Sequence, residues 1–351
     1  MQLIARAFTC ALLAGSTMAL GQGADAQTLR DKIRSHVMET RDARTGPMMR
    51  AQQRGGAGQG HLPGVQKAQA PEGAVKVSIE VGGNPRSFFL YKPEGFRHDG
   101  AAVLGLHGGG GNAAHLMSKA SLPRLAAERG FLAVFPDGVD GNWNDGREIF
   151  SDRPDDVAFM RALVDWLVVN EGIDRGRVFA TGSSNGGTMA QRLACDAADL
   201  VAGITTISAN LPDALYSICD PVQSTAVLMI NGTDDPLMPY WGGTPEIPGR
   251  EPSGAVLSSL DTAAFWADVA ICGRRLEPRD APDRVDDGTT VTAFAYDCRY
   301  DQVILLRING GGHGIPGGEP AQGIQARLTG PTSQEIDAFA LALSFFEQHD
   351  S

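Results

Sequence analysis

The sequence predicts an α/β protein with a mostly parallel central sheet, an N-terminal antiparallel hairpin and helices on both faces of the sheet. From about residue 101 onward, short buried-type strands alternate with helical stretches, which is typical of a parallel sheet covered by helices. Ahead of them, two alternating apolar and polar segments, Val75–Val81 and 87–91, flank the turn sequence 82–85 and indicate the hairpin. The 351 residues are 42% hydrophobic and 20% charged, which suits a globular chain with a large core.

The elements after the hairpin are predicted from apolar runs and from helical spacing. The predicted strands cover residues 101–106, 131–135, 177–181, 203–207, 226–230, 291–296 and 303–308. The predicted helices cover residues 113–129, 155–169, 186–195, 258–271 and 333–348. In the last helix, Ile336, Phe339, Leu343 and Phe346 fall at helical spacing, so we expect them to pack on the core.

The first 26 residues have the pattern of a secretory signal peptide. Arg6 precedes an apolar run at 7–20, and Ala24-Asp25-Ala26 provides a small-x-small cleavage site. The run is too short for a transmembrane anchor, which needs about 20 apolar residues. We therefore expect a secreted or periplasmic protein without a membrane span.

Residues 27–74 are predicted to be a flexible basic leader, followed by a catalytic domain at 75–351. Basic residues outnumber acidic ones between 28 and 54, and glycine, glutamine and proline dominate 55–71. Few large apolar side chains are present to offset the entropy of ordering. A solvated tether is the expectation, and a basic arm that touches an anionic surface is the alternative.

The charge of the whole chain argues against nucleic acid as a partner. The formal net charge is −11, whereas binding to nucleic acid depends on Lys and Arg side chains that neutralise phosphates. No Cys or His spacing suits zinc, so no metal site is expected.

Four cysteines follow the predicted signal peptide: Cys195, Cys219, Cys272 and Cys298. In an oxidising compartment an even number indicates disulfides, and four cysteines allow three pairings. Proximity favours Cys195 with Cys219 and Cys272 with Cys298, although the sequence alone does not select among the three.

The segment Gly182-Ser183-Ser184-Asn185-Gly186 fits the nucleophile motif G-x-S-x-G between a predicted strand and a predicted helix. Its glycines let strand and helix approach closely, and the helix N-terminus favours developing negative charge. Ser184 is therefore the predicted nucleophile.

A nucleophilic serine needs a base and an orienting carboxylate, here expected after later strands in the order Ser, acid, His. His313 follows the strand at 303–308 and is the predicted base, because the other histidines lie upstream of the serine or at the extreme C-terminus. Asp235 follows the strand at 226–230 and is the predicted acid, because Pro236 holds its backbone extended. Asp234 is the alternative.

An oxyanion hole must offer two backbone N–H groups to the tetrahedral intermediate. We expect one from Asn185, the residue after the nucleophile, and one from the glycine run at 108–111. Gly109 is the first choice of donor and Gly108 the second. No Lys-Ser/Thr follows the run, so it is not a Walker phosphate loop. His107 is expected to be a hydrogen-bonding residue of this loop rather than a catalyst.

Three aromatic residues are candidates for binding substrate. Trp143 lies in a polar segment after the strand at 131–135, and Tyr240 and Trp241 follow the predicted acid. Each is expected either to line an acyl or aromatic subsite or to pack its own loop.

Together these ordered motifs resemble the polyhydroxybutyrate depolymerase and feruloyl esterase families of α/β-hydrolases. The resemblance is carried by segments 107–109, 182–187, 231–243 and 310–317 and spans about residues 75–349. It implies the α/β-hydrolase fold, Ser184 as nucleophile, Asp235 as acid, His313 as base, and a bridge between Cys272 and Cys298.

The chain departs from the family pattern at two positions outside the triad. Asn231 stands where the family commonly has His, and Ile315 stands where it commonly has Trp after the catalytic histidine. The second change removes a candidate stacking surface.

The sequence thus predicts an exported serine esterase that hydrolyses carboxylic esters through an acyl-enzyme without a cofactor. The expected substrates are small or oligomeric: hydroxyalkanoate oligomers or polymers, or feruloyl- and acetyl-type esters. A serine peptidase of the same fold is one alternative, but no motif for recognising a peptide terminus is visible. A non-catalytic hydrolase-like ligand-binding protein is another, and the complete triad argues against it.

Overall fold

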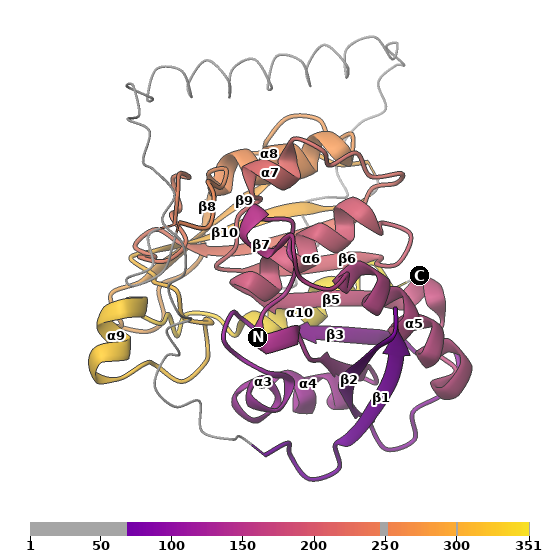
Figure 1. Cartoon of the computed structure of the whole chain (residues 1–351). Helices are drawn as coiled ribbons and strands as arrows, with labels where there is room; N and C mark the ends of the chain where they lie inside the picture. Colours follow the sequence, from indigo (N-terminus) through magenta and orange to yellow (C-terminus); the bar gives the residue numbers. More distant parts are fainter. Residues whose placement is uncertain (1–68, 246–251, 300, 351) are drawn as a thin grey trace, which may run out of the picture. The chain divides into compact units, whose positions relative to one another are not determined.

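A single mixed sheet of ten strands organises the described part of the chain, which in this computed structural model comprises residues 69–245, 252–299 and 301–350. Its strand order is β1-β2-β4-β3-β5-β6-β7-β10-β9-β8 (Figure 1). The strands are β1 Val75–Val81, β2 Asn84–Tyr91, β3 Ala102–Leu106, β4 Leu132–Pro136, β5 Val178–Ser183, β6 Gly203–Ile207, β7 Ala226–Gly232, β8 Arg279–Asp280, β9 Thr290–Ala295 and β10 Val303–Asn309. The predicted signal peptide at 1–26 and most of the predicted leader lie outside the described residues.

The six central strands, β4, β3, β5, β6, β7 and β10, run parallel to one another. At one side β1 and β2 form the predicted antiparallel hairpin, and at the other β9 and β8 add antiparallel strands. Every residue of β3, β4, β6 and β7 is buried, as expected where helices cover both faces. The predicted fold class, the α/β-hydrolase fold with a mostly parallel sheet and an N-terminal hairpin, is therefore confirmed.

Helices cover both faces of the sheet. The α-helices are α3 Ala113–Lys119, α4 Leu122–Glu128, α5 Asp156–Glu171, α6 Asn185–Asp196, α7 Asp213–Tyr216, α8 Ser259–Val269, α9 Gly323–Thr329 and α10 Ala338–Phe346. On one face α6 and α8 are joined by a hydrogen bond of 3.1 Å from the Trp266 indole to Gln191 Oε1. On the other face α10 stacks Phe346 on Phe179 of β5, with ring centroids 4.7 Å apart. In Figure 1, α6 lies in front of the sheet and α10 behind it.

Two predicted helices differ from the structure. The single helix expected at 113–129 is two helices, because the chain becomes extended at Ala120 and Pro123 lies in the first turn of α4. Proline has no N–H and cannot continue a preceding helix. The last helix begins at Ala338 rather than near 333, since the Asp337 carboxylate caps it by accepting from Ala340 N at 2.9 Å.

Two disulfides join neighbouring elements in the pairing that proximity favoured. Cys195–Cys219 links the end of α6 to the segment after α7, and Cys272–Cys298 links the segment after α8 to the segment after β9. None of the helices in the described ranges is long and apolar enough to cross a membrane.

Candidate active site

Ser184 occupies a strained turn between β5 and α6. Its backbone has φ 52° and ψ −124°, a conformation that L-residues rarely adopt and that costs about 1–3 kcal/mol. The Ser184 N–H donates to Ile207 O at 2.8 Å, which fixes the turn against β6. The side chain makes no capping hydrogen bond to α6 and is partly exposed, so its hydroxyl is accessible.

The turn depends on glycine at two positions. A Cβ atom on Gly186 would collide with the carbonyl oxygens of Leu106 and His107, and one on Gly182 would lie 2.5 Å from the backbone of Gly186. No side chain fits at such separations, so the G-x-S-x-G pattern here reflects the close approach of β3, β5 and α6.

The glycine run after β3 lies against this turn. A Cβ atom on Gly109 would lie 3.6 Å from Asn185 Cβ, and one on Gly108 would lie 3.7 Å from Ser184 Cβ. Asn185 is the first residue of α6, so its N–H has no intrahelical acceptor. Within the described residues, the hydrogen bonds include none donated by the N–H of Gly109 or of Asn185. The two predicted oxyanion donors therefore lie beside each other at the turn that carries Ser184.

His107 holds the glycine run in place. Its Nδ1 lies 2.9 Å from Gly108 O and its Nε2 accepts from Gly138 N at 3.0 Å, so the ring is a donor at Nδ1 and an acceptor at Nε2. Burial lowers the pKa of His107, although the hydrogen bond to Gly108 O acts in the opposite direction. A neutral imidazole fits both bonds, and this is the structural role expected of it.

The structure brings Asp235 to His313. Asp235 Oδ2 lies 2.7 Å from His313 Nδ1, and Asp235 Oδ1 accepts from the N–H groups of Leu237 and Met238 at 2.8 Å each. The alternative acid, Asp234, accepts instead from Thr233 Oγ1. All three acceptor bonds of Asp235 thus orient its carboxylate toward the imidazole.

The two loops that carry this pair are bonded to each other. Asp234 N donates to Gly311 O at 2.9 Å, and Gly310 N donates to Thr233 Oγ1 at 2.8 Å. A Cβ atom on Gly232 would overlap the Gly311 carbonyl, so glycine is required for this approach. The C-terminal end of α9 also supports the loop, because His313 N donates to Thr329 O.

Ser184, Asp235 and His313 all follow parallel strands, β5, β7 and β10 respectively. The carboxyl ends of parallel strands meet at one edge of the sheet, so all three residues lie along that edge.

Of the three candidate substrate-binding aromatics, only Trp241 offers an exposed ring, with 66% of its surface accessible. Trp143 has no exposed surface, and its indole N–H donates to His107 O at 2.9 Å. Tyr240 is 1% exposed, and burial raises the pKa of its phenol against the opposing charges of Arg307 and Arg275. The structure places Trp143 and Tyr240 in the packed interior. This agrees with the second of the two roles expected for them, packing within their own loops, rather than with substrate contact.

Sequence reasoning missed a buried ion pair next to Asn185. The Asp145 carboxylate is fully buried, pairs with Arg147 at 2.6 Å and accepts from the Asn185 amide at 2.6 Å. The only signal in the sequence was the polar segment 137–147 after β4, which gives no indication of which side chains are buried.

Asn231, where the family commonly has histidine, is a structural residue. Its Nδ2 donates to Asn210 Oδ1 at 2.8 Å and to Ser259 Oγ at 2.9 Å, and so links β7 to α8. The substitution is accommodated by a buried hydrogen-bond network.

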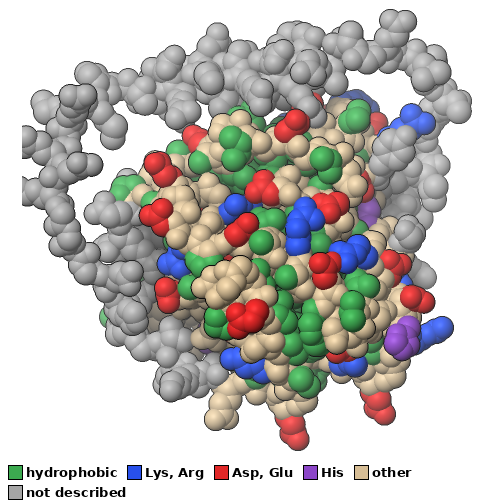
Figure 2. Space-filling view, turned by 45° about the vertical axis from the view of Figure 1, so that its right-hand side comes forward, with side chains coloured by type: hydrophobic (Ala, Val, Ile, Leu, Met, Phe, Trp, Pro, Cys, Tyr) green, Lys and Arg blue, Asp and Glu red, His purple; other side chains and the backbone are tan. Residues whose placement is uncertain are grey.

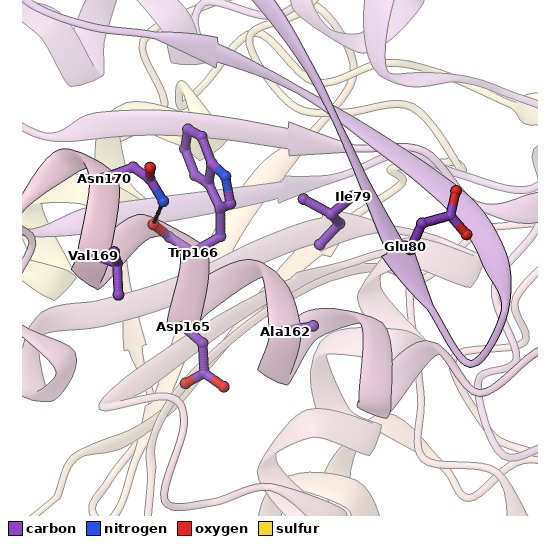
Figure 3. Close-up of a pocket in the computed structure, with 7 residues that line it drawn as sticks. All are labelled: Ile79, Glu80, Ala162, Asp165, Trp166, Val169 and Asn170. Atoms are coloured by element: carbon purple, nitrogen blue, oxygen red, sulfur yellow. Dashed lines mark hydrogen bonds between the residues drawn. The ribbon is translucent and has the colours of Figure 1, made fainter.

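A pocket of about 370 Å³ lies away from these residues, between β1 and α5 (Figure 3). It is lined by Ile79, Glu80, Ala162, Asp165, Trp166, Val169 and Asn170. The described residues contain no cluster of three or more His, Cys, Asp or Glu side chains that could hold a metal ion. The face drawn in Figure 2 carries interspersed acidic and basic side chains.

The fold and this site define an α/β-hydrolase, and comparison with known proteins identifies its family. The chain is 30% identical over 285 residues to a protein of Nocardia uniformis subsp. tsuyamanensis named "Putative esterase NocK", covering 80% of that relative. It is 27% identical to feruloyl esterase B of Piromyces equi and 31% identical to a probable feruloyl esterase C of Aspergillus terreus. The chain spans 42% of the Piromyces protein and 58% of the Aspergillus protein. The matches cover 76% of this chain for the Nocardia relative, 65% for the Piromyces relative and 46% for the Aspergillus relative.

The chain therefore belongs to the esterase family of α/β-hydrolases that includes these relatives. An acetyl xylan esterase from Aspergillus awamori shares the fold, with a TM-score of 0.51 at 15% identity over 72% of this chain and 98% of that one. No known family profile matches the chain.

Proposed function

We propose that this protein is an exported serine esterase that hydrolyses carboxylic esters through an acyl-enzyme, with Ser184 as nucleophile, His313 as base and Asp235 as acid. The observation that carries the proposal is the 2.7 Å contact between His313 Nδ1 and Asp235 Oδ2 at the sheet edge that also bears the strained Ser184. With Nδ1–H donated to the carboxylate, Nε2 is left as an acceptor for the serine proton.

The reaction follows from these positions. Ser184 Oγ bonds to the ester carbonyl carbon as its proton passes to His313 Nε2. The oxyanion accepts from the N–H groups of Asn185 and Gly109. The C–O bond to the alcohol then breaks, and the leaving oxygen takes the proton from His313. Water attacks the acyl-enzyme in the same way, releasing the acid and restoring Ser184.

The proposed substrates are feruloyl- or acetyl-type esters, or hydroxyalkanoate oligomers and polymers. Relatives named feruloyl esterases support the first class, and the exposed ring of Trp241 offers an aromatic acyl group a surface to stack on. A comparison of kcat/KM over methyl ferulate, acetylated xylan and hydroxybutyrate oligomers ranks these classes.

Export is part of the proposal. The signal-peptide pattern at 1–26 and the two disulfides support a secreted or periplasmic location, because disulfides persist in oxidising compartments. Mass spectrometry of the protein recovered outside the cytoplasm should give Gln27 as the N-terminal residue. A protein retained in the cytoplasm with residues 1–26 intact would contradict it.

The catalytic assignment is tested by fluorophosphonate labelling and by hydrolysis of short p-nitrophenyl esters. We expect labelling and hydrolysis in the wild type and in Ser183→Ala, a neighbouring serine that is also partly exposed, and neither in Ser184→Ala. Cleavage of amides at a rate comparable to esters would favour a peptidase. A wild-type protein that is neither labelled nor active would favour a binding protein.

A further inference from the structure

We infer that Asp145 and Arg147 are positioning residues that align the two halves of the oxyanion hole through the side chain of Asn185. The inference rests on the proposed function, which places the hole at the N–H groups of Gly109 and Asn185. The connection between β4 and α5 carries both residues and is bonded to each half.

The half that carries Gly109 is bonded to this connection at three points. Gly138 N donates to His107 Nε2 at 3.0 Å, and the Trp143 indole donates to His107 O at 2.9 Å. Gly110 N donates to Gly141 O at 2.7 Å. The glycine run therefore has a fixed position relative to segment 138–143.

The other half is fixed by the Asn185 side chain. Its Oδ1 accepts from Trp143 N at 2.7 Å, and its Nδ2 donates to Trp143 O at 3.2 Å and to Asp145 Oδ2 at 2.6 Å. These partners fix the orientation of the amide, because an N–H donor faces its oxygen while a carbonyl and a carboxylate face its nitrogen. Asn185 is the first residue of α6, so its side chain sets the position of its own backbone N–H relative to the same segment.

The ion pair with Arg147 allows the Asp145 carboxylate to be buried beside Asn185. Asp145 has no exposed surface, and Arg147 approaches it with Nη2 at 2.6 Å and with Nε at 3.0 and 3.1 Å from its two oxygens. The remaining Nη1 donates to Ser253 Oγ at 3.1 Å. The guanidinium compensates the negative charge of the Asp145 carboxylate, which would otherwise repel the nearby oxyanion.

Stability alone gives little reason for such a pair. Burying two charges carries a desolvation cost that well-packed apolar residues avoid. Orientation of the Asn185 amide accounts for a carboxylate at this point, since a short charge-assisted hydrogen bond is stronger and more directional than a neutral one.

The test compares Asn185→Ala and Asp145→Asn with a control, Asp165→Asn, which removes an exposed carboxylate on α5 that pairs with Arg175. Asn185→Ala keeps the backbone N–H, so any loss of activity reports positioning.

We expect kcat per fluorophosphonate-labelled site to fall about 10- to 100-fold in both variants, with KM within about threefold, because misplacement by about 1 Å costs about 10²-fold. Affinity for a boronic acid, which mimics the tetrahedral intermediate, should fall by a similar factor. Asp165→Asn should match the wild type.

The double variant Asn185→Ala/Asp145→Asn supplies a second readout. If both residues act through one contact, it should be no more than about threefold slower than Asn185→Ala alone. Additive losses would overturn the inference. A wild-type kcat per labelled site in Asn185→Ala would also overturn it, and this outcome can be measured even if Asp145→Asn does not fold. Loss of labelled sites with unchanged kcat would show a structural role only.

These outcomes are separable from failure of the proposed function. Full activity in Ser184→Ala would overturn the triad and this inference together. An inactive Ser184→Ala combined with wild-type kinetics in Asn185→Ala would overturn this inference alone.

Discussion

The imidazole of His313 is oriented from a neighbouring loop: its Nδ1 lies 2.7 Å from Asp235 Oδ2, while Asp235 Oδ1 is held by two backbone N–H groups of its own loop. The carboxylate therefore has no rotational freedom of its own. The direction of the histidine ring is set by the turn after β7.

Asp235→Asn should abolish most activity. The two backbone donors, Leu237 N and Met238 N, require oxygen at the Oδ1 position, so the amide nitrogen would face His313 Nδ1. The ring would then carry its proton on Nε2 and could not take the serine proton. We expect kcat to fall about 10³- to 10⁴-fold. Asp234→Asn is the matched control, and equal losses in the two variants would argue for a shared or reversed role.

Gly186→Ala should prevent normal folding. The added Cβ would collide with two backbone carbonyls, of Leu106 and His107, which cannot move as a flexible side chain would. We expect a loss of about 3 kcal/mol or more in the free energy of unfolding, measured by urea denaturation. Gly176→Ala, whose Cβ would meet Asp174 Oδ1 at an ordinary 3.4 Å, should stay within about 1 kcal/mol of the wild type.

Removing either disulfide should destabilise the protein by about 3.5 kcal/mol, the loop-entropy value for separations of 24 and 26 residues. The pairing makes a sharper prediction. Cys272→Ser and the double variant Cys272→Ser/Cys298→Ser should have nearly the same unfolding free energy, because the first change already breaks the bridge. A large additional loss in the double variant would point to a different pairing.

Stability should decline in mild acid because of His107. Burial lowers the pKa of His107 in the folded chain, and burial also lowers the pKa of His349. The unfolded chain takes up these protons from about pH 6.5, before the folded chain does. The stabilisation is thus complete above about pH 6.5 and is lost as the pH falls toward the folded-state pKa, by up to about 1.4 kcal/mol per pH unit for each histidine.

His107→Gln keeps a donor and an acceptor but does not titrate. Its unfolding free energy should therefore change less between about pH 7 and pH 5 than that of the wild type, as measured by denaturation at several pH values. Identical slopes for the two proteins would refute the assignment.

Trp241 and its neighbour Tyr240 should respond in opposite ways to truncation. Trp241→Ala removes an exposed ring, so we expect little change in stability. Relative to the wild type, KM should rise several-fold for aromatic acyl esters and change little for acetyl esters. Tyr240→Ala empties a buried site and should cost about 3 kcal/mol of stability. An unchanged ratio of KM values in Trp241→Ala would remove this residue from the substrate site.

Much of this architecture could be predicted from the sequence, because its signals are local. Apolar runs bounded by turns indicated the strands, and the strand-turn-helix setting of Ser184 indicated the elbow. The break at Ala120 was missed because helical periodicity continues across it, although Pro123 marked the boundary. The start of α10 was missed because Asp337, not the apolar pattern, ends the preceding segment.

The sequence by itself determined the fold class, the order along the chain of the proposed nucleophile, acid and base, and the glycines that let their loops approach. Only the tertiary structure shows that Asp235 rather than Asp234 contacts His313, that Trp241 is exposed while Trp143 is buried, and that a buried Asp145 lies beside Asn185. Residue type and spacing reflect backbone conformation, whereas burial and hydrogen-bond partners depend on segments that meet only when the sheet assembles.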